Sequence, residues 1–327
     1  MKKKLLALTL AGVLALSLAA CGSTEETQEP AASGDGTYTI GICQLVQHDA
    51  LDAATQGFID AVKEGLGEEN VHILEQNASN DSAACSSICG QFVTEGVDLI
   101  LANATPALQA AVAATGSIPI LGTSVTEYGV ALDIDNFSGT VGGNVSGTSD
   151  LAPLDQQAAM VKELFPNAKT VGLVYCSGEP NSQYQVDTVK GYLEDLDYTC
   201  ELYSFVDSND VTSVVKTACD NSDVLYIPTD NTAASNAEAI NNVAQPAGVP
   251  IVAGEEGICA GCGVATLSIN YYDLGVATGN MAVRILKDGE DISTMAIEYA
   301  PQFTKKYNVD LADALGVTIP EDYVAIG

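Results

Sequence analysis

The chain has 327 residues, with 43 acidic and 12 basic side chains, and its net charge at pH 7 is −31. A surface of this charge repels polyanions, which excludes nucleic acid as a partner and excludes binding to anionic lipid through the protein surface. The length is sufficient for two domains of ordinary size, each with its own core.

Residues 1–20 have the pattern of a secretory signal peptide. Three lysines precede an apolar run, Leu5 to Leu18, which is shorter than the roughly 20 residues that a membrane-spanning helix needs. Small residues then precede Cys21, a pattern that lipoprotein processing cleaves just before the cysteine. We expect Cys21 to be lipidated and residues 21–36 to form a flexible tether, because they lack apolar periodicity. The body of the protein would then be secreted and held by lipid at the extracellular face of the cytoplasmic membrane.

Alternating strands and helices are predicted from Tyr38 onward. Short apolar runs indicate strands, and apolar residues at a helical period indicate helices. The predicted order is strand 38–43, helix 51–66, strand 71–76, helix 82–95, strand 98–102, a helix from the 103–106 loop to 115, and strand 118–122.

The same order of strands and helices returns from Thr170, so the body of the chain contains an internal repeat. The second copy is strand 170–175, helix 182–196, strand 200–206, helix 211–219, strand 223–227, helix 233–247 and strand 249–253. Parallel strands need helical crossovers, so the pattern predicts an α/β fold of two Rossmann-like lobes with parallel sheets joined by a hinge.

A last helix, from Asn270 to just before Gly289, is assigned to the first lobe. The predicted N-terminal lobe is residues 37–150 plus about 265–295. The predicted C-terminal lobe is residues 151–264 plus about 296–327.

Candidate binding residues follow from the repeat. Loops after parallel strands lie at the carboxyl edge of a sheet, where open α/β sheets bind ligands. When Asp98 is aligned with Asp223, Thr105 corresponds to Asp230. We expect Thr105 to cap the helix that starts at Pro106, whose free N–H groups suit a carboxylate, and Asp230 to bind an α-ammonium group. Either residue could instead only cap its own helix. Other strand-end loops supply the candidates Gln47, His48, Asn80, Ser124, Thr126, Ser149, Asp150, Ser182, Asn231 and Glu255.

Five short segments form a pattern that extends over the body of the chain. They are 47–54, 104–107, 143–151, 228–232 and 270–275. In this order and spacing they resemble the ABC transporter substrate-binding family of tryptophan/tyrosine type. The resemblance implies a type I periplasmic-binding-protein fold. It also implies that the protein binds a small solute, expected to be an aromatic amino acid, and delivers it to an ABC permease and its ATPase. It implies no catalytic residue, no cofactor and no metal.

Nine cysteines leave alternatives open. Cys43 and Cys176 are read as equivalent in the two copies and could act as acid and base in a racemase-like enzyme. The pairs Cys85/Cys89 and Cys259/Cys262 could supply four thiolates to a metal-binding lipoprotein. Buried free thiols are a simpler explanation of the same residues. A receptor lipoprotein that senses the solute in place of transporting it is a further alternative.

Overall fold

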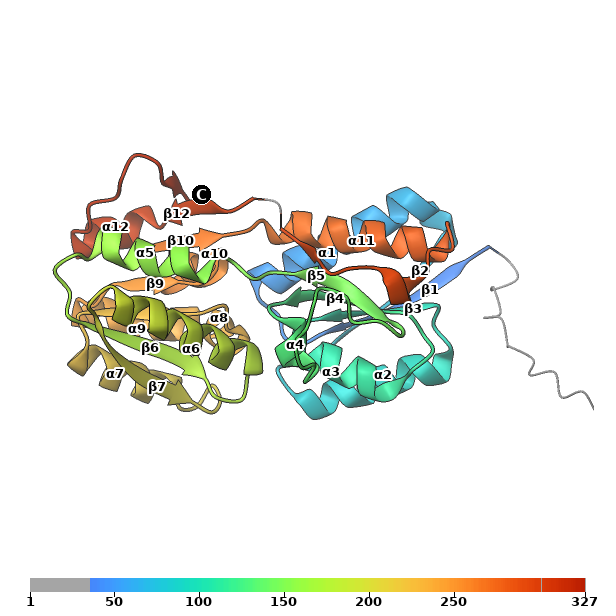
Figure 1. The fold of residues 1–327 in the computed structure, drawn as a ribbon, viewed down its shortest axis with the longest axis horizontal. Coiled ribbons are helices and arrows are strands. Elements are labelled where there is room, and N and C mark those ends of the chain that lie inside the picture. The colour runs from blue at the N-terminus through green and yellow to red at the C-terminus, as the bar shows by residue number, and fades with distance from the viewer. Residues whose placement is uncertain (1–35, 301, 327) are drawn as a thin grey trace, which may run out of the picture.

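The computed structural model describes residues 36–300 and 302–326, which form two lobes lying side by side (Figure 1). Each lobe is a sheet with helices on both faces, and the sheets are parallel apart from one antiparallel pair in the second lobe. The repeated pattern therefore predicted the fold class correctly. The signal peptide, Cys21 and the tether up to residue 35 lie outside the described residues. No helix in the described ranges has the length and apolarity to cross a membrane.

The first lobe is built on a six-stranded sheet in the order β11-β5-β4-β3-β1-β2. Its strands are β1 (Tyr38–Gln44), β2 (Val71–Asn77), β3 (Leu99–Asn103), β4 (Ile120–Val125), β5 (Val145–Ser149) and β11 (Glu298–Tyr299). Its helices are α1 (Asp49–Leu66), α2 (Ser82–Glu95), α3 (Thr105–Ala114), α4 (Tyr128–Ala131) and α11 (Tyr271–Leu286), with 3-10 turns η1 (Glu68–Asn70) and η2 (Ile292–Thr294).

The second lobe is built on a seven-stranded sheet in the order β13-β12-β10-β9-β8-β6-β7. Its strands are β6 (Thr170–Cys176), β7 (Thr199–Phe205), β8 (Val224–Ile227), β9 (Ile251–Ala253), β10 (Ala265–Ser268), β12 (Thr304–Tyr307) and β13 (Val324–Ala325). Its helices are α5 (Leu154–Leu164), α6 (Pro180–Asp195), α7 (Val211–Asn221), α8 (Asn231–Ser235), α9 (Ala237–Ala247), α10 (Glu256–Cys262) and α12 (Val309–Leu315).

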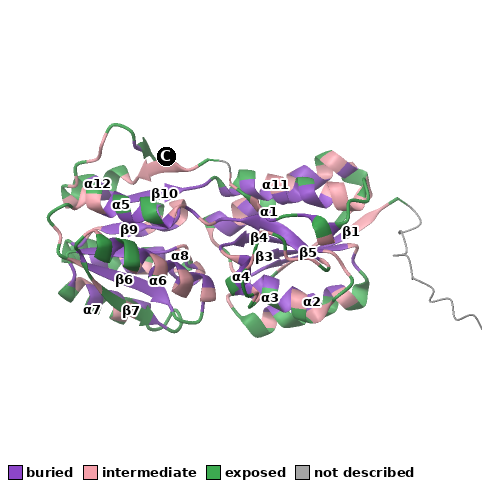
Figure 2. Ribbon diagram, viewed as in Figure 1, coloured by how far each residue is buried: buried purple, intermediate pink, exposed green. Residues whose placement is uncertain are grey.

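The central strands are buried on both faces, as Figure 2 shows. In the first lobe, α1 and α11 cover one face of the sheet and α2 and α3 cover the other. In the second lobe, α5, α6 and α12 cover one face, and α7, α9 and α10 cover the other. Strands buried on both faces read as continuous apolar runs, which is why β3 and β8 were recognisable in the sequence.

Helices α1 and α11 pack with their backbones in contact (Figure 1). A Cβ atom added at Gly57 would lie 2.1 Å from the Tyr272 carbonyl oxygen, and one at Gly275 would lie 2.0 Å from the Ala54 carbonyl oxygen. Only glycine permits this approach. The helix that follows Asn270 is thereby fixed to the first lobe.

The two copies share an anchor at the start of their central strands. Asp98 accepts a hydrogen bond from the Thr39 backbone N–H (2.7 Å), and Asp223 accepts one from the Thr170 backbone N–H (3.0 Å). Residues 39 and 170 are therefore equivalent, and the alignment on Asp98 and Asp223 matches the structure.

Between residues 36 and 326 the described chain passes between the lobes three times, and two short segments differ from the predicted division. Residues 265–268 were placed in the first lobe, but they form β10, which pairs with β9 and β12 of the second sheet. Residues 298–299 were placed in the second lobe, but they form β11, which pairs with β5 of the first sheet. In both cases strand pairing takes the chain further along one sheet before it crosses. The crossovers are the β5–α5, β10–α11 and β11–β12 connections.

One predicted helix is divided in two. The sequence predicted a continuous helix over 233–247, whereas α8 ends at Ser235 and α9 begins at Ala237. At the break, Asn236 has φ −120° and ψ 16°, and its side-chain amide donates to the Thr232 carbonyl oxygen at 2.7 Å. A side chain that bonds to nearby backbone competes with the regular helix, which explains the interruption.

Candidate functional site

The carboxyl edges of the two sheets meet through hydrogen bonds between the lobes. In the first lobe, His48 follows β1 and Asn80 follows β2; in the second, Asn231 and Thr232 follow β8. His48 Nε2 lies 3.3 Å from Asn231 Oδ1, and Asn80 Nδ2 donates to Thr232 Oγ1 at 3.0 Å. The structure thus brings together three of the predicted residues, His48, Asn80 and Asn231.

His48 is held in one tautomer by its neighbour. The Asn231 side-chain amide donates to Glu179 Oε2 at 2.7 Å, so its carbonyl oxygen is the atom that faces His48. His48 Nε2 must then carry the proton, which leaves a lone pair on Nδ1. Burial lowers the pKa of His48, against the Asn231 hydrogen bond and the charge of Glu179, so the neutral ring is favoured. Nδ1 is buried and has no partner among the described residues.

Asp150 lies at the end of β5, where the first crossover begins, and it is buried. Its Oδ2 accepts a hydrogen bond from the Tyr271 hydroxyl at 3.0 Å, while its Oδ1 has no partner within the described residues. Burial raises the pKa of Asp150, against the Tyr271 hydrogen bond, which lowers it. Such a carboxyl favours a cationic group that would replace the lost hydration.

The neighbouring strand ends contribute small hydroxyl side chains. Ser124 has φ 53°, in the left-handed region, and its buried Oγ has no partner in the part of the chain that the structure describes. The Ser149 hydroxyl instead donates to the Thr126 carbonyl oxygen at 2.7 Å. Ser124 therefore has a free donor, whereas Ser149 and Thr126 bond within the lobe.

Asp230 is buried and caps its own helix. Its Oδ1 accepts from the Ala233 N–H and its Oδ2 accepts from the Cys176 N–H, both at 2.7 Å. Burial and the charge of Glu179 raise the pKa of Asp230 to about 8, although the two N–H donors and Ser182 lower it. This is the capping use that the sequence left open as an alternative. Contact with a ligand ammonium remains a prediction for Asp230.

Thr105 is not the helix cap that the sequence predicted. The N-cap of α3 is Ala104, which has φ 92°, and Thr105 and Pro106 are already helical. Helix α3 begins one residue earlier because the backbone turn is completed at Ala104. Thr105 is buried, and no side-chain cap bond forms at this end.

Three other predicted residues have separate positions. Glu255 is the N-cap of α10 and accepts from the Gly257 and Ile258 N–H groups, and burial raises its pKa to about 7. Ser182 is fully buried in the first turn of α6. Gln47 is exposed, and with His48 it lines a groove of about 510 Å³ between the lobes.

Two buried residues were missed because α6 begins earlier than predicted. The sequence placed the helix start at Ser182, whereas Pro180 is its first residue and Glu179 its N-cap. Glu179 and Asn181 are both buried, and Asn181 Oδ1 has no partner among the described residues. Proline at the first helical position, preceded by an acidic residue, was the signal that could have revealed them.

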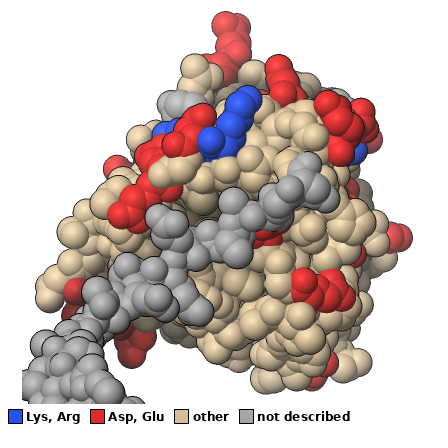
Figure 3. Space-filling view, turned by 90° about the vertical axis from the view of Figure 1, so that its right-hand side faces the viewer, with Lys and Arg blue, Asp and Glu red and all other residues tan. Residues whose placement is uncertain are grey.

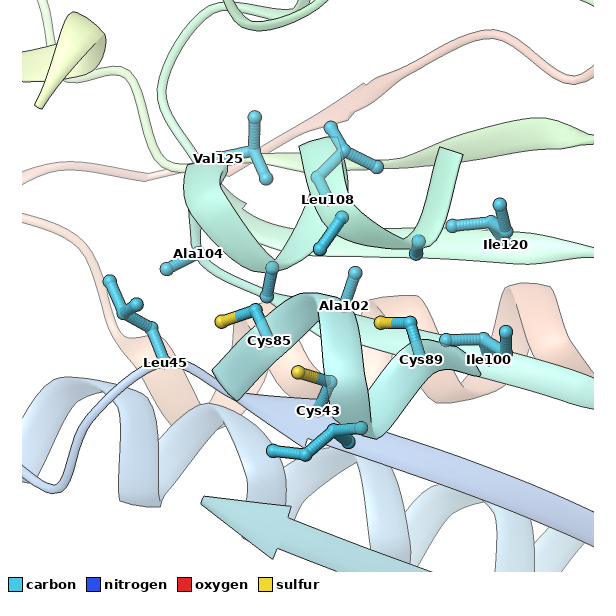
Figure 4. Packing of buried hydrophobic residues seen from close by; sticks show 14 of the residues in the cluster. Cys43, Leu45, Cys85, Cys89, Ile100, Ala102, Ala104, Leu108, Ile120 and Val125 are labelled. Atoms are coloured by element: carbon cyan, nitrogen blue, oxygen red, sulfur yellow. The ribbon is translucent and has the colours of Figure 1, made fainter. Parts of the chain in front are cut away.

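The cysteines do not form the sites that the alternatives require. Residues 39 and 170 are equivalent, so Cys176 lies two positions beyond the counterpart of Cys43, and an acid–base pair from matched positions is not present. Cys85 and Cys89 lie on α2 in the first lobe, where their thiols gather with Cys43 in the core (Figure 4). Cys259 and Cys262 lie on α10 in the other lobe. The described residues contain no group of three or more His, Cys, Asp or Glu placed to hold a metal ion.

The surface agrees with the acidic composition. On the end of the first lobe shown in Figure 3, acidic side chains are scattered and basic ones are few. Where described residues are visible on that face, they form no large basic patch that would attract a polyanion.

Comparison with known proteins identifies the family. The family model described as ABC transporter substrate binding protein matches residues 39–326. A tyrosine-binding protein of Clostridioides difficile is 36% identical over 323 residues, which is 96% of this chain and 92% of that protein.

Two solved structures are similar over nearly the whole body. The ABC domain from Streptococcus pneumonia in complex with L-Trp is 33% identical, with a TM-score of 0.83, over 87% of this chain and 96% of that one. A ligand-free, open substrate-binding protein with adhesive properties from Clostridium difficile is 38% identical, with a TM-score of 0.68, over 89% of this chain and 99% of that one. The score is higher for the L-Trp complex although the identity is lower, and in this structure the lobes are in contact through the His48–Asn231 and Asn80–Thr232 pairs.

The family and these relatives are substrate-binding proteins and not enzymes. Together with two α/β lobes whose carboxyl edges face each other, these matches show that the chain belongs to the ABC transporter substrate-binding protein family.

Proposed function

We propose that this protein captures a free aromatic amino acid, tyrosine or tryptophan, between its lobes. One observation carries the proposal: five buried polar atoms at the facing edges have no partner among the described residues. They are His48 Nδ1, Asn103 Oδ1, Ser124 Oγ, Asp150 Oδ1 and Asn181 Oδ1. Buried polar atoms are nearly always hydrogen-bonded in native proteins, so a polar solute is the natural partner for this set.

The chemistry of four of these atoms fits an amino acid. The neutral His48 ring, Asp150 and Asn181 each offer an acceptor, and an ammonium group has three N–H donors. Ser124 offers a hydroxyl donor for a carboxylate. Asp150 supplies the negative charge that an α-ammonium would pair with in this buried environment. We assign the ammonium to Asp150 in preference to Asp230, because both oxygens of Asp230 already bond to backbone N–H groups.

The aromatic side chain is inferred from the relatives. The related protein of Clostridioides difficile is a tyrosine-binding protein, and the similar structure from Streptococcus pneumonia holds L-Trp. Both share about a third of their residues with this chain over nearly its whole body. Aromatic amino acids are therefore the first solutes to test.

The two lobes would move as separate bodies about the three crossovers. We take residues 37–150 with α11 and β11 as one body, and residues 151–268 with β12, α12 and β13 as the other. A solute that contacts both lobes stabilises closure by its differential affinity for the closed state. The closed protein would then deliver the solute to an ABC permease and its ATPase.

Thermal unfolding against a panel of solutes tests the binding proposal. Saturating solute at about 100 times its dissociation constant adds about 2.7 kcal/mol to the free energy of unfolding. We expect tyrosine or tryptophan to raise the midpoint, and sugars, polyols and nucleosides to leave it unchanged. A shift with one of those compounds and none with any amino acid would overturn the assignment of the solute.

Anchoring and import need their own experiments. We expect a metabolic palmitate label to appear on the protein in cells and to disappear in Cys21→Ser. Cells that lack the protein should take up labelled tyrosine or tryptophan more slowly, and the wild-type gene should restore uptake. Normal uptake in those cells would contradict the importer role and favour a sensing role.

A further inference from the structure

Glu179 is a buried carboxylate with an unusual set of partners. It is 4% exposed, and no ion pair joins it to a basic side chain in the part of the chain that the structure describes. Its Oε2 accepts from the Asn231 backbone N–H at 3.0 Å and from the Asn231 side-chain amide at 2.7 Å. Its Oε1 accepts from the Thr232 N–H and the Thr232 hydroxyl, both at 2.8 Å. One carboxylate thus fixes two consecutive residues, backbone and side chain alike.

These two residues are the ones that reach the first lobe. Because the amide nitrogen of Asn231 is bound to Glu179, its carbonyl oxygen is left to accept from His48. Because the hydroxyl proton of Thr232 points to Glu179, its oxygen is left to accept from the Asn80 amide. Glu179 therefore decides the direction of these two hydrogen bonds between the lobes.

We propose that Glu179 is a positioning residue for lobe closure, which orients Asn231 and Thr232 so that they accept hydrogen bonds from His48 and Asn80 as the lobes meet. This inference rests on the proposed capture of a solute by closure, but it does not depend on which solute is captured. These contacts join protein to protein, so they stabilise the closed state in addition to the solute.

A purely structural role makes a different prediction. Asn231 and Thr232 begin α8, so Glu179 also satisfies two backbone N–H groups of that helix. If this were its whole role, its loss would lower the free energy of unfolding and leave the balance of open and closed lobes unchanged. The experiment must therefore measure closure and stability separately.

The main variant is Glu179→Gln, because a glutamine has the same shape but turns an N–H₂ group toward donors. Glu201→Gln on exposed β7 of the same lobe is the matched control. We expect Glu179→Gln to increase the radius of gyration in X-ray scattering without solute. With solute bound, we expect the solute to dissociate about tenfold to thirtyfold faster, because two hydrogen bonds between the lobes are lost. Glu201→Gln should match the wild type. The chain contains no tryptophan, so the fluorescence of a bound tryptophan solute reports dissociation directly.

A double-mutant cycle separates positioning from general weakening. Asn80 has φ 63°, which glycine tolerates, so Asn80→Gly removes its side chain without backbone strain. If Glu179 acts through Thr232 on Asn80, the double variant should release solute less than about twofold faster than Glu179→Gln alone. Rate increases that simply multiply would overturn the proposal.

Three further outcomes also decide for or against the proposal. If Glu179→Gln does not fold, Thr232→Val replaces it, since valine keeps the N–H and removes only the hydroxyl between Glu179 and Asn80. A lower unfolding midpoint with unchanged radius and unchanged dissociation rate would overturn the proposal. If no solute binds, the proposed function fails, but the radius of gyration without solute still tests this inference. A larger radius in Glu179→Gln than in the wild type supports the inference, and an unchanged radius overturns it.

Discussion

The facing edges of the two lobes differ in whether their buried polar groups have hydrogen-bond partners within the protein. In the first lobe, His48, Asn103, Ser124 and Asp150 each keep one buried atom without a partner within the described residues. In the second lobe, the oxygens of Glu179, Asp230 and Glu255 are occupied by backbone N–H groups, which lie at the starts of α8 and α10 and, for Asp230 Oδ2, at the end of β6. At the facing edge of the second lobe, Asn181 Oδ1 is the exception among the described residues.

This difference suggests a division of work between the lobes. The buried acids of the second lobe stabilise helix starts, so their oxygens are already occupied by the protein. The open atoms of the first lobe are available to a solute. Substitutions on the two edges should therefore affect different quantities, affinity on one side and stability on the other.

Asp150→Asn should have the largest effect, and the effect should be on affinity. The variant removes the charge that we pair with the solute ammonium, which we expect to cost about 2–5 kcal/mol of binding free energy. The free energy of unfolding should stay within about 1 kcal/mol, because asparagine still accepts from the Tyr271 hydroxyl. Isothermal titration with tyrosine and tryptophan, together with urea unfolding, measures both.

Asp288→Asn is the control for that variant, since Asp288 is an exposed aspartate beyond the end of α11. It should bind solute as the wild type does. Wild-type affinity in Asp150→Asn would remove Asp150 from the site.

Asp230→Asn should act on stability. An asparagine accepts one of the two N–H groups that Asp230 binds and turns its amide nitrogen toward the other, so we expect a loss of about 2–4 kcal/mol in the free energy of unfolding. Urea unfolding at constant pH measures this loss. If the variant is stable but no longer binds solute, Asp230 and not Asp150 binds the solute's ammonium group, as the alignment of the two copies first suggested.

Stability should also depend on pH through Asp230. Its folded pKa of about 8 lies above the ordinary value near 4 that it has when unfolded, so between these values the folded state holds a proton that the unfolded state has lost. Its contribution is present below about pH 4 and is lost as the pH rises to about 8. The urea midpoint should fall over this window in the wild type and fall less in Asp230→Asn. Equal slopes in the two proteins would contradict the raised pKa.

The smallest predicted effect compares equivalent positions in the two copies. Asp81 caps α2 and accepts from the Ala83 and Ala84 N–H groups, whereas Asp210 at the start of α7 makes no side-chain cap bond. Asp81→Ala should therefore cost about 1 kcal/mol, and Asp210→Ala less than about 0.5 kcal/mol. Equal losses in urea unfolding would show that the two helix starts are equivalent after all.

The repeat explains how much of the fold was predictable. In each copy the buried strands are apolar runs, and an aspartate, Asp98 or Asp223, anchors the first strand. The alternation of strands and helices and the alignment of the two copies could therefore be predicted from the sequence. The break at Asn236 could not, because it depends on a side chain bonding to the Thr232 carbonyl in the folded structure. The pairing of β11 with β5 depends on contacts between distant segments and was likewise hidden.

The candidate site was predictable in position more than in role. Strand-end reasoning located His48, Ser124 and Asp150, because parallel strands end at one edge. It could not tell which polar atoms would be satisfied inside the protein, and so it gave Asp230 the role that we now propose for Asp150. Glu179 was missed because its helix begins before the serine that looked like its start.

A crystal structure of the protein with bound tyrosine or tryptophan tests the central claim most directly. The account predicts the ammonium nitrogen within hydrogen-bonding distance of Asp150 Oδ1, with Asp230 still bound to the Cys176 and Ala233 N–H groups. An ammonium bound by Asp230 or Glu179, with Asp150 Oδ1 left free, would contradict it.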